Sequence, residues 1–377
     1  TRRSSDLELL FMQLASMYDD ADDALTTFAK TNESYVAPAL ARGLTQQTCT
    51  TYGVASVSWE EFAAAMVQNG HNLDLCRRFG IDEDMFNHDR LTFSLRDASG
   101  MCVGFARRYL PYTKEQASLA KLAGRSYPAK YKNTSSDVPF YDKSTFVYGL
   151  DTAKKHNNSR LELYEGYGDV LMAKQVGIMA SAASCGTSIT EGQIDAMMAA
   201  GFKRINIVYD NEPQGQMASF SNLSKFGGRE GLYLSVMFLP FDENVPLPDR
   251  DPDTFLRTKG KDAYFEVKPV TAFDQRLNCL MDAGLNGLQV AEDMVKLIVN
   301  EPSKVRQGEM IQTLATRTGV KEEDIRSEIT RITDKRVLSI TETLSKRLAL
   351  SRDARERMDL IKNSTLELGQ FNEEKDA

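Results

Sequence analysis

The sequence lacks long apolar runs and has few of the residues that build disulfide or zinc frameworks. Its 377 residues include five cysteines and three histidines. No apolar stretch approaches the roughly 18 to 20 residues that a membrane-spanning helix needs. The cysteines are scattered without a Cys-x-x-Cys pair, and no histidine lies at metal-ligand spacing. We therefore expect no membrane association, no zinc in this chain, no disulfide framework and a reducing, cytoplasmic compartment.

The chain also lacks an overall excess of positive charge. It has 46 basic and 53 acidic residues, a formal net charge of −7, which argues against nucleic-acid binding because phosphate contacts need a basic face. Residues 104–132 reverse this balance. Their charged residues are Arg107, Arg108, Lys114, Lys121, Arg125, Lys130 and Lys132 against Glu115 alone. Interleaved tyrosines could offer rings to bases while the cations hold phosphates, although such a run is also compatible with a solvated surface.

The beginning of the chain predicts a helix. The chain starts at Thr1 without an initiator Met, and residues 7–14 show an amphipathic pattern that does not fit a signal peptide. We therefore expect the sequence to be a fragment or a processed product.

Two patterns of secondary structure follow one another along the chain. Residues 91–95 and 101–105 are strand-like and flank a turn signal at Asp97-Ala98-Ser99-Gly100, which predicts a hairpin. From about residue 160 apolar strands alternate with helices, the pattern of a parallel sheet covered by helices. The expected strands are 161–164, 177–183, 204–209 and 232–239, and the expected helices are 169–175, 190–200 and 214–225.

The last third predicts a helical bundle. After about residue 262 apolar positions recur at spacings of three and four, as at Met294, Leu297 and Ile298. Glu301-Pro302-Ser303 predicts a break between helices, and the polar end 372–377 is expected to fray.

Acidic residues follow three of the expected strands. The motifs are Glu165-Gly166-Tyr167-Gly168-Asp169-Val170, Asp210-Asn211-Glu212 and Asp251-Pro252-Asp253. Ligands bind outside the carboxyl ends of the strands in open α/β sheets, so these acids can converge on one small volume. Gathered carboxylates repel one another, and binding Mg²⁺ or Mn²⁺ through oxygen relieves the repulsion. Each motif alone also fits a turn or a helix cap, so the metal site rests on the three together.

The same residues resemble a known family. The acidic motifs, with Gly186-Thr187-Ser188-Ile189-Thr190 between the first two, resemble the Toprim domain of bacterial DnaG-type primases. The first third resembles the N-terminal part of the same polymerase core. Its matching motifs are Arg42-Gly43-Leu44-Thr45, Tyr52-Gly53-Val54, Asp89-Arg90, Gly104-Phe105-Ala106-Arg107-Arg108, Lys130-Tyr131-Lys132-Asn133-Thr134, Lys143 and Tyr148-Gly149-Leu150. The resemblance spans about residues 35–260.

The resemblance implies an α/β fold in three parts. These would be a basic α+β lobe at 1–155, a Toprim metal-binding catalytic domain with a parallel sheet at 156–262, and a helical subdomain at 263–377. The implied metal ligands are Glu165, Asp169, Asp210, Glu212, Asp251 and Asp253, with Glu165, Asp210 and Glu212 catalytic. The implied nucleotide and template contacts are Arg42, Arg107, Arg108, Lys130, Tyr131, Asn133 and Lys143.

By the same resemblance the chain would be a DNA primase, a nucleotidyltransferase that uses two or more Mg²⁺ or Mn²⁺ ions. It would make short RNA primers from ribonucleoside triphosphates on single-stranded DNA in a bacterial cell, with a replicative helicase as a further partner. Asp210-Asn211-Glu212 replaces the family's Asp-Gly-Asp, a divergence that suits a bacteriophage enzyme. Two alternatives stay open: a Toprim nuclease that hydrolyses the backbone with water, and an inactive scaffold that binds single strands or a helicase.

Overall fold

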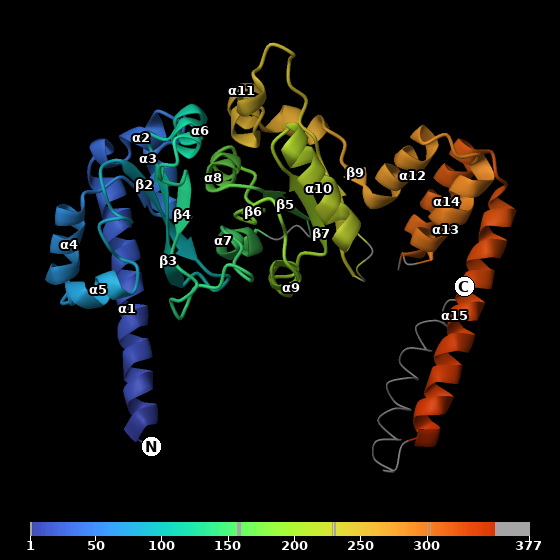
Figure 1. Cartoon of the computed structure of the whole chain (residues 1–377), viewed down its shortest axis with the longest axis horizontal. Helices are drawn as coiled ribbons and strands as arrows, with labels where there is room; N and C mark the ends of the chain where they lie inside the picture. The colour runs from blue at the N-terminus through green and yellow to red at the C-terminus, as the bar shows by residue number, and fades with distance from the viewer. Residues whose placement is uncertain are drawn as a thin grey trace. The chain divides into compact units, whose positions relative to one another are not determined.

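A computed structural model describes residues 2–156, 160–227, 229, 231–299, 301 and 303–350. The chain divides into two compact units (Figure 1). The first comprises Thr1–Lys225 and Leu232–Pro269, and the second comprises Phe226–Gly231 and Val270–Ala377. The end at 372–377, where fraying is expected, lies outside the described residues.

The first unit begins with a helical layer on an antiparallel sheet. The helices are α1 (Arg2–Thr31), α2 (Ala37–Leu40), α3 (Gln46–Tyr52), α4 (Trp59–Gln68) and α5 (Leu73–Arg78), with the 3₁₀ turn η1 (Glu33–Tyr35) after α1. The helix expected at 7–14 is thus part of α1. Buried aromatic rings fill the space between helices and sheet. The Phe62 and Phe86 rings stack with centroids 3.6 Å apart, and Phe105 of the sheet lies 5.2 Å from Phe86.

The antiparallel sheet has the strand order β1-β2-β3-β4. Its strands are β1 (Val54–Ala55), β2 (Arg90–Arg96), β3 (Cys102–Tyr109) and β4 (Tyr131–Asn133), and α6 (Lys114–Leu122) lies between β3 and β4. The predicted hairpin is therefore confirmed as β2 and β3. Asp97 fixes its turn because its Oδ1 accepts the N–H groups of Ser99 and Gly100, and Gly100 takes the left-handed backbone (φ 96°) that glycine tolerates.

A parallel sheet follows, with the order β6-β5-β7-β8. Its strands are β5 (Arg160–Tyr164), β6 (Ser181–Ala183), β7 (Arg204–Val208) and β8 (Tyr233–Val236), and its helices are α7 (Leu150–Lys155), α8 (Tyr167–Gln175), α9 (Glu191–Ala199), α10 (Pro213–Phe226) and α11 (Pro252–Glu266), with η2 (Leu247–Asp249) before α11. The expected alternation is confirmed. The strand expected at 177–183 is shorter, because Gly177 (φ 88°) and the next residues form the connection from α8.

A ladder of polar side chains crosses the middle of this sheet. Glu162 of β5 and Asn206 of β7 are register partners, and Asn206 Nδ2 donates to Glu162 Oε2 at 2.8 Å. Tyr264 of α11 donates to the same oxygen at 2.8 Å. Because buried polar groups are costly unless hydrogen-bonded, this network fixes where α11 lies on the sheet.

The second unit is helical, as the sequence predicts for the last third. It contains the short strand β9 (Val270–Thr271) and the helices α12 (Ala272–Asp282), α13 (Gly287–Ile298), α14 (Lys304–Thr318) and α15 (Glu322–Leu350). Buried apolar side chains, among them Leu277, Met294 and Leu314, form its own core. The expected break near residue 301 separates α13 from α14. No helix in the part of the chain that the structure describes is long and apolar enough to cross a lipid bilayer.

Candidate metal and nucleotide site

Six carboxylates, which we call the acid cluster, lie at the carboxyl edge of the parallel sheet. Glu165 directly follows β5, and Asp210 follows the neighbouring strand β7 after one residue. The loop that carries Asp251 is tied to the Asp210 loop, because Asn211 N–H donates to Arg250 O at 2.8 Å. The members of the acid cluster are Glu165, Asp169, Asp210, Glu212, Asp251 and Asp253.

Several of these carboxylates also hold helix N-termini. Asp169 in the first turn of α8 accepts the Gly166 N–H at 3.2 Å and, through its other oxygen, the Asp253 N–H at 3.2 Å. Asp251 caps α11 by accepting the Thr254 N–H at 2.7 Å. Helix N-termini carry positive partial charge and so stabilise carboxylates. For the motifs of Asp169 and Asp251, a role at a helix N-terminus and membership of the acid cluster therefore both hold in the structure.

Burial and mutual repulsion raise the pKa values of three carboxyl groups in the acid cluster. Burial raises the pKa of Asp169 well above its usual range, and the negative charges of Asp210, Asp251 and Asp253 raise it further. Burial, followed by the charges of Glu165, Asp251 and Glu212, raises the pKa of Asp210 to about 7. Burial and Asp251 raise the pKa of Asp253 to about 6. Each of the six acids thus interacts electrostatically with at least one other member of the acid cluster.

Basic side chains lie near these acids, and they come both from the part of the first unit with the antiparallel sheet and from the part with the parallel sheet. Lys130 lowers the pKa of Asp210, opposing the carboxylates. Arg42, Arg257 and Arg108 act in the same direction on Asp253, and Arg42 Nη2 lies 4.0 Å from Asp253 Oδ2. The structure therefore brings three of the expected phosphate contacts, Arg42, Arg108 and Lys130, to the acid cluster.

Arg257 was not among the candidates from the sequence. It lies one turn after Asp253 on α11, a spacing that places both on one helix face. Its stem packs against the backbone of Gly43, where an added Cβ would lie 2.7 Å from Arg257 Cδ. The sequence signal that could have identified Arg257 was its position four residues after Asp253, the spacing of about one helical turn.

Tyr131 and Asn133 of β4 line one cavity together with Glu165. Arg108 Nη1 lies 3.2 Å from the Tyr131 hydroxyl, and the Lys130 ammonium lies 5.8 Å from the centre of the same ring. The Asn133 amide is engaged on both sides, since Nδ2 donates to the Tyr141 hydroxyl at 2.9 Å and Oδ1 accepts from the Tyr167 hydroxyl at 2.9 Å. Asn133 therefore ties β4 to α8, a positioning role that the sequence did not indicate.

A cavity of about 430 Å³ opens beside Glu165. Its walls include Tyr131, Asn133, Lys143, Glu165, Tyr167 and Cys185. A second cavity of about 520 Å³ shares Lys143 and Cys185 and continues along the loop before α9. Thr190 caps α9 by accepting the Gln193 N–H, at the spacing of a capping box. Lys143 thus lies where a phosphate in either cavity would meet a positive charge.

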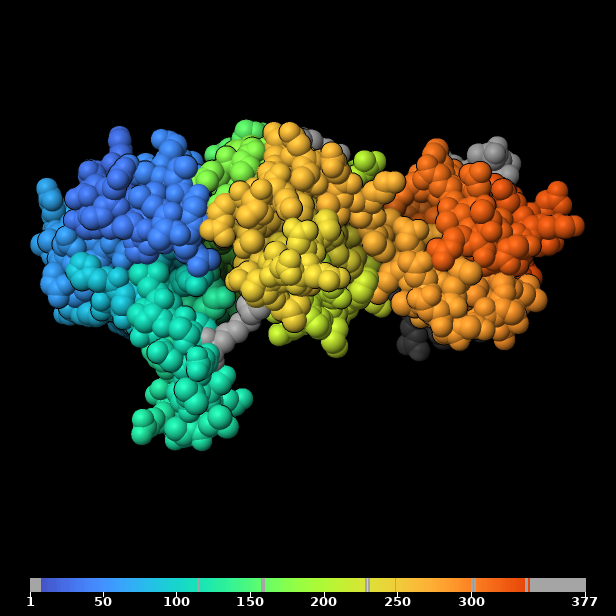
Figure 2. Space-filling model, turned by 90° about the horizontal axis from the view of Figure 1, so that it is seen from above, coloured from blue at the N-terminus to red at the C-terminus, as the bar shows by residue number. Residues whose placement is uncertain are grey.

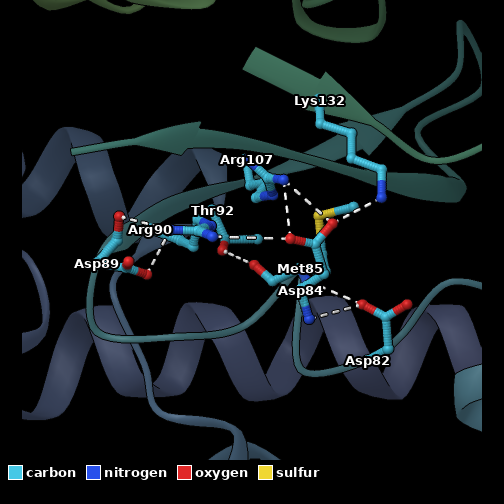
Figure 3. Close-up of polar contacts among 8 residues, drawn as sticks. All are labelled: Asp82, Asp84, Met85, Asp89, Arg90, Thr92, Arg107 and Lys132. Atoms are coloured by element: carbon cyan, nitrogen blue, oxygen red, sulfur yellow. Dashed lines mark hydrogen bonds and ion pairs between the residues drawn. The ribbon is translucent and has the colours of Figure 1, made fainter. Parts of the chain in front are cut away.

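The structure engages Arg107 in a separate polar network around Asp84 (Figure 3). Neighbouring residues of a strand point to opposite faces, so Arg107 lies on the other side of β3 from Arg108. Arg107 is 4% exposed, and its Nη2 contacts both carboxylate oxygens of Asp84 at 2.8 and 3.1 Å. Lys132 and Arg90 also approach Asp84, at 2.6 and 3.7 Å. This burial goes against the expected contact of Arg107 with a nucleotide or template.

The Asp84 network gives an asymmetric stability prediction. Asp84→Asn leaves the buried Arg107 guanidinium without its counter-charge, and we expect it to lower the free energy of unfolding by about 3 kcal/mol. Arg107→Met removes the buried charge itself, while Asp84 keeps Lys132, Arg90 and partial solvent contact. We expect a loss of about 1 kcal/mol or less for that variant. Urea unfolding of both variants measures the difference, and equal losses would contradict this assignment.

The acid cluster offers oxygen ligands of the kind that hard divalent cations prefer. Among the described residues, no three Asp, Glu, His or Cys side chains are arranged closely enough to enclose a metal ion as they stand. The donor type and the unrelieved repulsion nevertheless fit a divalent cation, because such a charge would lower the raised carboxylate pKa values. Glu165, Asp210 and Glu212 are the acids that leave a strand end without capping a helix in the contacts described above.

Two family models match the chain one after the other. Residues 25–154 match the DNA primase catalytic core, N-terminal domain, and residues 163–256 match a Toprim-like domain. A DNA primase of Clostridium acetobutylicum is 28% identical over 306 residues, which cover 76% of this chain and 46% of that protein. The chain thus spans about half the length of this curated relative.

Solved structures show the same fold. A DnaG primase catalytic domain bound to single-stranded DNA matches 83% of this chain and 99% of its own, with a TM-score of 0.59 and 23% identity. The RNA polymerase domain of Mycobacterium tuberculosis DnaG, in complex with double-stranded DNA, matches 82% of this chain and 98% of its own, with a TM-score of 0.60 and 18% identity. The two family matches, the curated primase relative and this fold agree: the chain carries an N-terminal domain of the DNA primase catalytic core followed by a Toprim-like domain, and it resembles DnaG-type primases over both.

Proposed function

We propose that the chain synthesises short RNA primers on single-stranded DNA. The observation that carries this proposal is the acid cluster facing Arg42, Arg108 and Lys130 within one compact unit. The related protein from Clostridium acetobutylicum is a DNA primase, and a similar catalytic domain binds single-stranded DNA. Carboxylates that can bind metal ions, facing basic side chains that can bind phosphates, are an arrangement that suits phosphoryl transfer.

In this proposal the acid cluster holds two or more Mg²⁺ or Mn²⁺ ions, with Glu165, Asp210 and Glu212 as catalytic ligands. Asp169, Asp251 and Asp253 would complete the site while they fix α8 and α11. Bound divalent ions would activate the attacking hydroxyl and neutralise the charge of the triphosphate. The 3′-oxygen of one ribonucleotide forms a bond to the α-phosphorus of the next and its hydroxyl proton passes to water. The bond from that phosphorus to the bridging oxygen breaks, and its electrons leave on pyrophosphate.

The basic side chains would hold the reactants in line. Lys130 and Arg108 lie beside the acids, so they suit the phosphates of the incoming nucleotide or of the template. Lys143 lines the cavity next to Glu165, which is large enough for a nucleotide. Tyr131 offers a ring between these cations, on which a base can stack.

Two further expectations belong to this proposal. A replicative primase works in the bacterial cytoplasm, and the scattered cysteines suit a reducing compartment. The second unit forms a helical core of its own, which would suit contact with a replicative helicase. Both rest on the family and not on a contact in this chain.

The test is incubation with single-stranded DNA, labelled ribonucleoside triphosphates and Mg²⁺ or Mn²⁺. We expect a ladder of short RNA products that depends on template and on divalent metal. Shortened template without RNA products would support the Toprim nuclease instead. Template binding without either product would support the inactive scaffold.

A further inference from the structure

We propose that residues 110–130, here called the β3–β4 arm, bind a nucleic-acid backbone beyond the catalytic site, which the arm meets at Lys130. This inference rests on the proposed function, because it assigns a second contact for the same nucleic acid. The arm projects from the body of its unit in Figure 2, where it takes the teal colour of this part of the chain. Within it α6 spans Lys114–Leu122.

Charge makes the arm unlike the rest of the chain. Its basic residues are Lys114, Lys121, Arg125 and Lys130 against Glu115, whereas the whole chain has a net charge of −7. Lys121 and Arg125 are exposed. Exposed cations on a projecting segment of an acidic protein suit a polyanion, since each phosphate contact releases counterions.

Aromatic packing fixes the base of the arm. The Tyr127 ring lies 6.0 Å from Tyr109 and 5.7 Å from Tyr112, and its hydroxyl donates to Gln116 Oε1 at 2.6 Å. The guanidinium of Arg90 lies 4.5 Å from the centre of the Tyr109 ring. These contacts tie the base of the arm to β3 and to α6.

The ends of the arm lead into the catalytic site. Arg108 and Tyr131 are register partners at its base, and Tyr109 N–H donates to Lys130 O at 2.9 Å. Lys130 and Arg108 reach Asp210 and Asp253 electrostatically. A strand held at the acid cluster by Arg108 and Lys130 could therefore contact further cations, Arg125 and Lys121, on the same arm.

The test removes the two outer charges with Lys121→Ala/Arg125→Ala. The matched control is Lys203→Ala/Arg204→Ala, which removes two exposed charges at the opposite edge of the parallel sheet, where β7 begins. Binding of a 30-nucleotide single strand and of a duplex of the same length is measured against salt concentration without nucleotides or metal. We expect about ten-fold weaker binding of one or both probes and a log–log salt slope smaller by about 1.4 to 1.8 units.

A loss confined to one probe would identify whether the arm holds single strands or duplex. Unchanged binding of both probes, or an equal loss in the control, would overturn the inference and would favour a protein partner for the exposed Leu119 and Leu122. Primer synthesis at saturating template should keep its maximal rate while the template concentration for half-maximal rate rises. Because the binding measurement needs no turnover, failure of the arm and failure of the proposed activity give different results.

Discussion

Asp210→Asn is expected to reduce primer synthesis by about three orders of magnitude or more while making the metal-free protein more stable. The loss follows from removing a metal-binding charge, since such ions supply several kcal/mol of transition-state stabilisation and each 1.36 kcal/mol is ten-fold in rate. The gain in stability follows from the site's repulsion. Burial and the neighbouring carboxylates raise the pKa of Asp210 to about 7, so its ionised form opposes folding, whereas a neutral amide of the same shape does not.

Lost synthesis together with increased stability distinguishes a catalytic role of Asp210 from simple misfolding of the variant. Synthesis is measured at pH 8 with Mg²⁺, and thermal unfolding is measured at pH 8 in EDTA. Asp195→Asn, an exposed carboxylate on α9 of the same unit, is the matched control and should change neither quantity appreciably. Glu165→Gln should lose synthesis in the same way, because it follows the neighbouring strand. Retained synthesis in Asp210→Asn, or a lower unfolding temperature together with lost synthesis, would contradict the site assignment.

The position of the acid cluster was predictable because it follows from the geometry of parallel sheets. Glu165 and Asp210 each follow an apolar strand, and parallel strands end at one edge of their sheet. The hairpin of β2 and β3 and the α9 capping box were equally local. Each depends on residues a few positions apart, at Asp97 and at Thr190 with Gln193. Such features need no knowledge of the tertiary fold.

The basic residues were harder because their roles depend on distant contacts. Arg107 and Arg108 are neighbours in a motif, yet the strand sends Arg107 to the face that it shares with the buried Phe105. The alternation of side chains along a strand could have assigned Arg107 and Arg108 to opposite faces. It could not have identified Asp84 as the partner of Arg107, because Asp84 lies 23 residues away in the sequence. Asn133 likewise meets Tyr167 only across the two parts of the first unit. Membership of a motif therefore predicted the region of the site and not the direction of each side chain.

Stability of the metal-free protein should fall as pH rises from about 5 to 8, and divalent metal should reverse this trend. The carboxyl pKa values are raised in the folded state, to about 7 for Asp210 and about 6 for Asp253. The folded protein therefore binds more protons than the unfolded chain between about pH 4 and 8, and stability decreases with pH across that window.

The measurement is thermal unfolding at pH 5, 6, 7 and 8, in EDTA and in Mg²⁺. Ionised carboxylates bind the metal, so the stabilisation by Mg²⁺ should grow with pH as protons stop competing. The measurement stops at pH 8 because burial lowers the pKa of Lys174 to about 8. Above that value this lysine makes stability rise with pH, which is opposite to the effect of the carboxylates. The difference between Mg²⁺ and EDTA should shrink in Asp210→Asn, since one competing site is gone. A stabilisation by Mg²⁺ that is the same at pH 5 and pH 8 would mean that these carboxylates do not hold the metal, because protons and cations could not then be competing for the same oxygens.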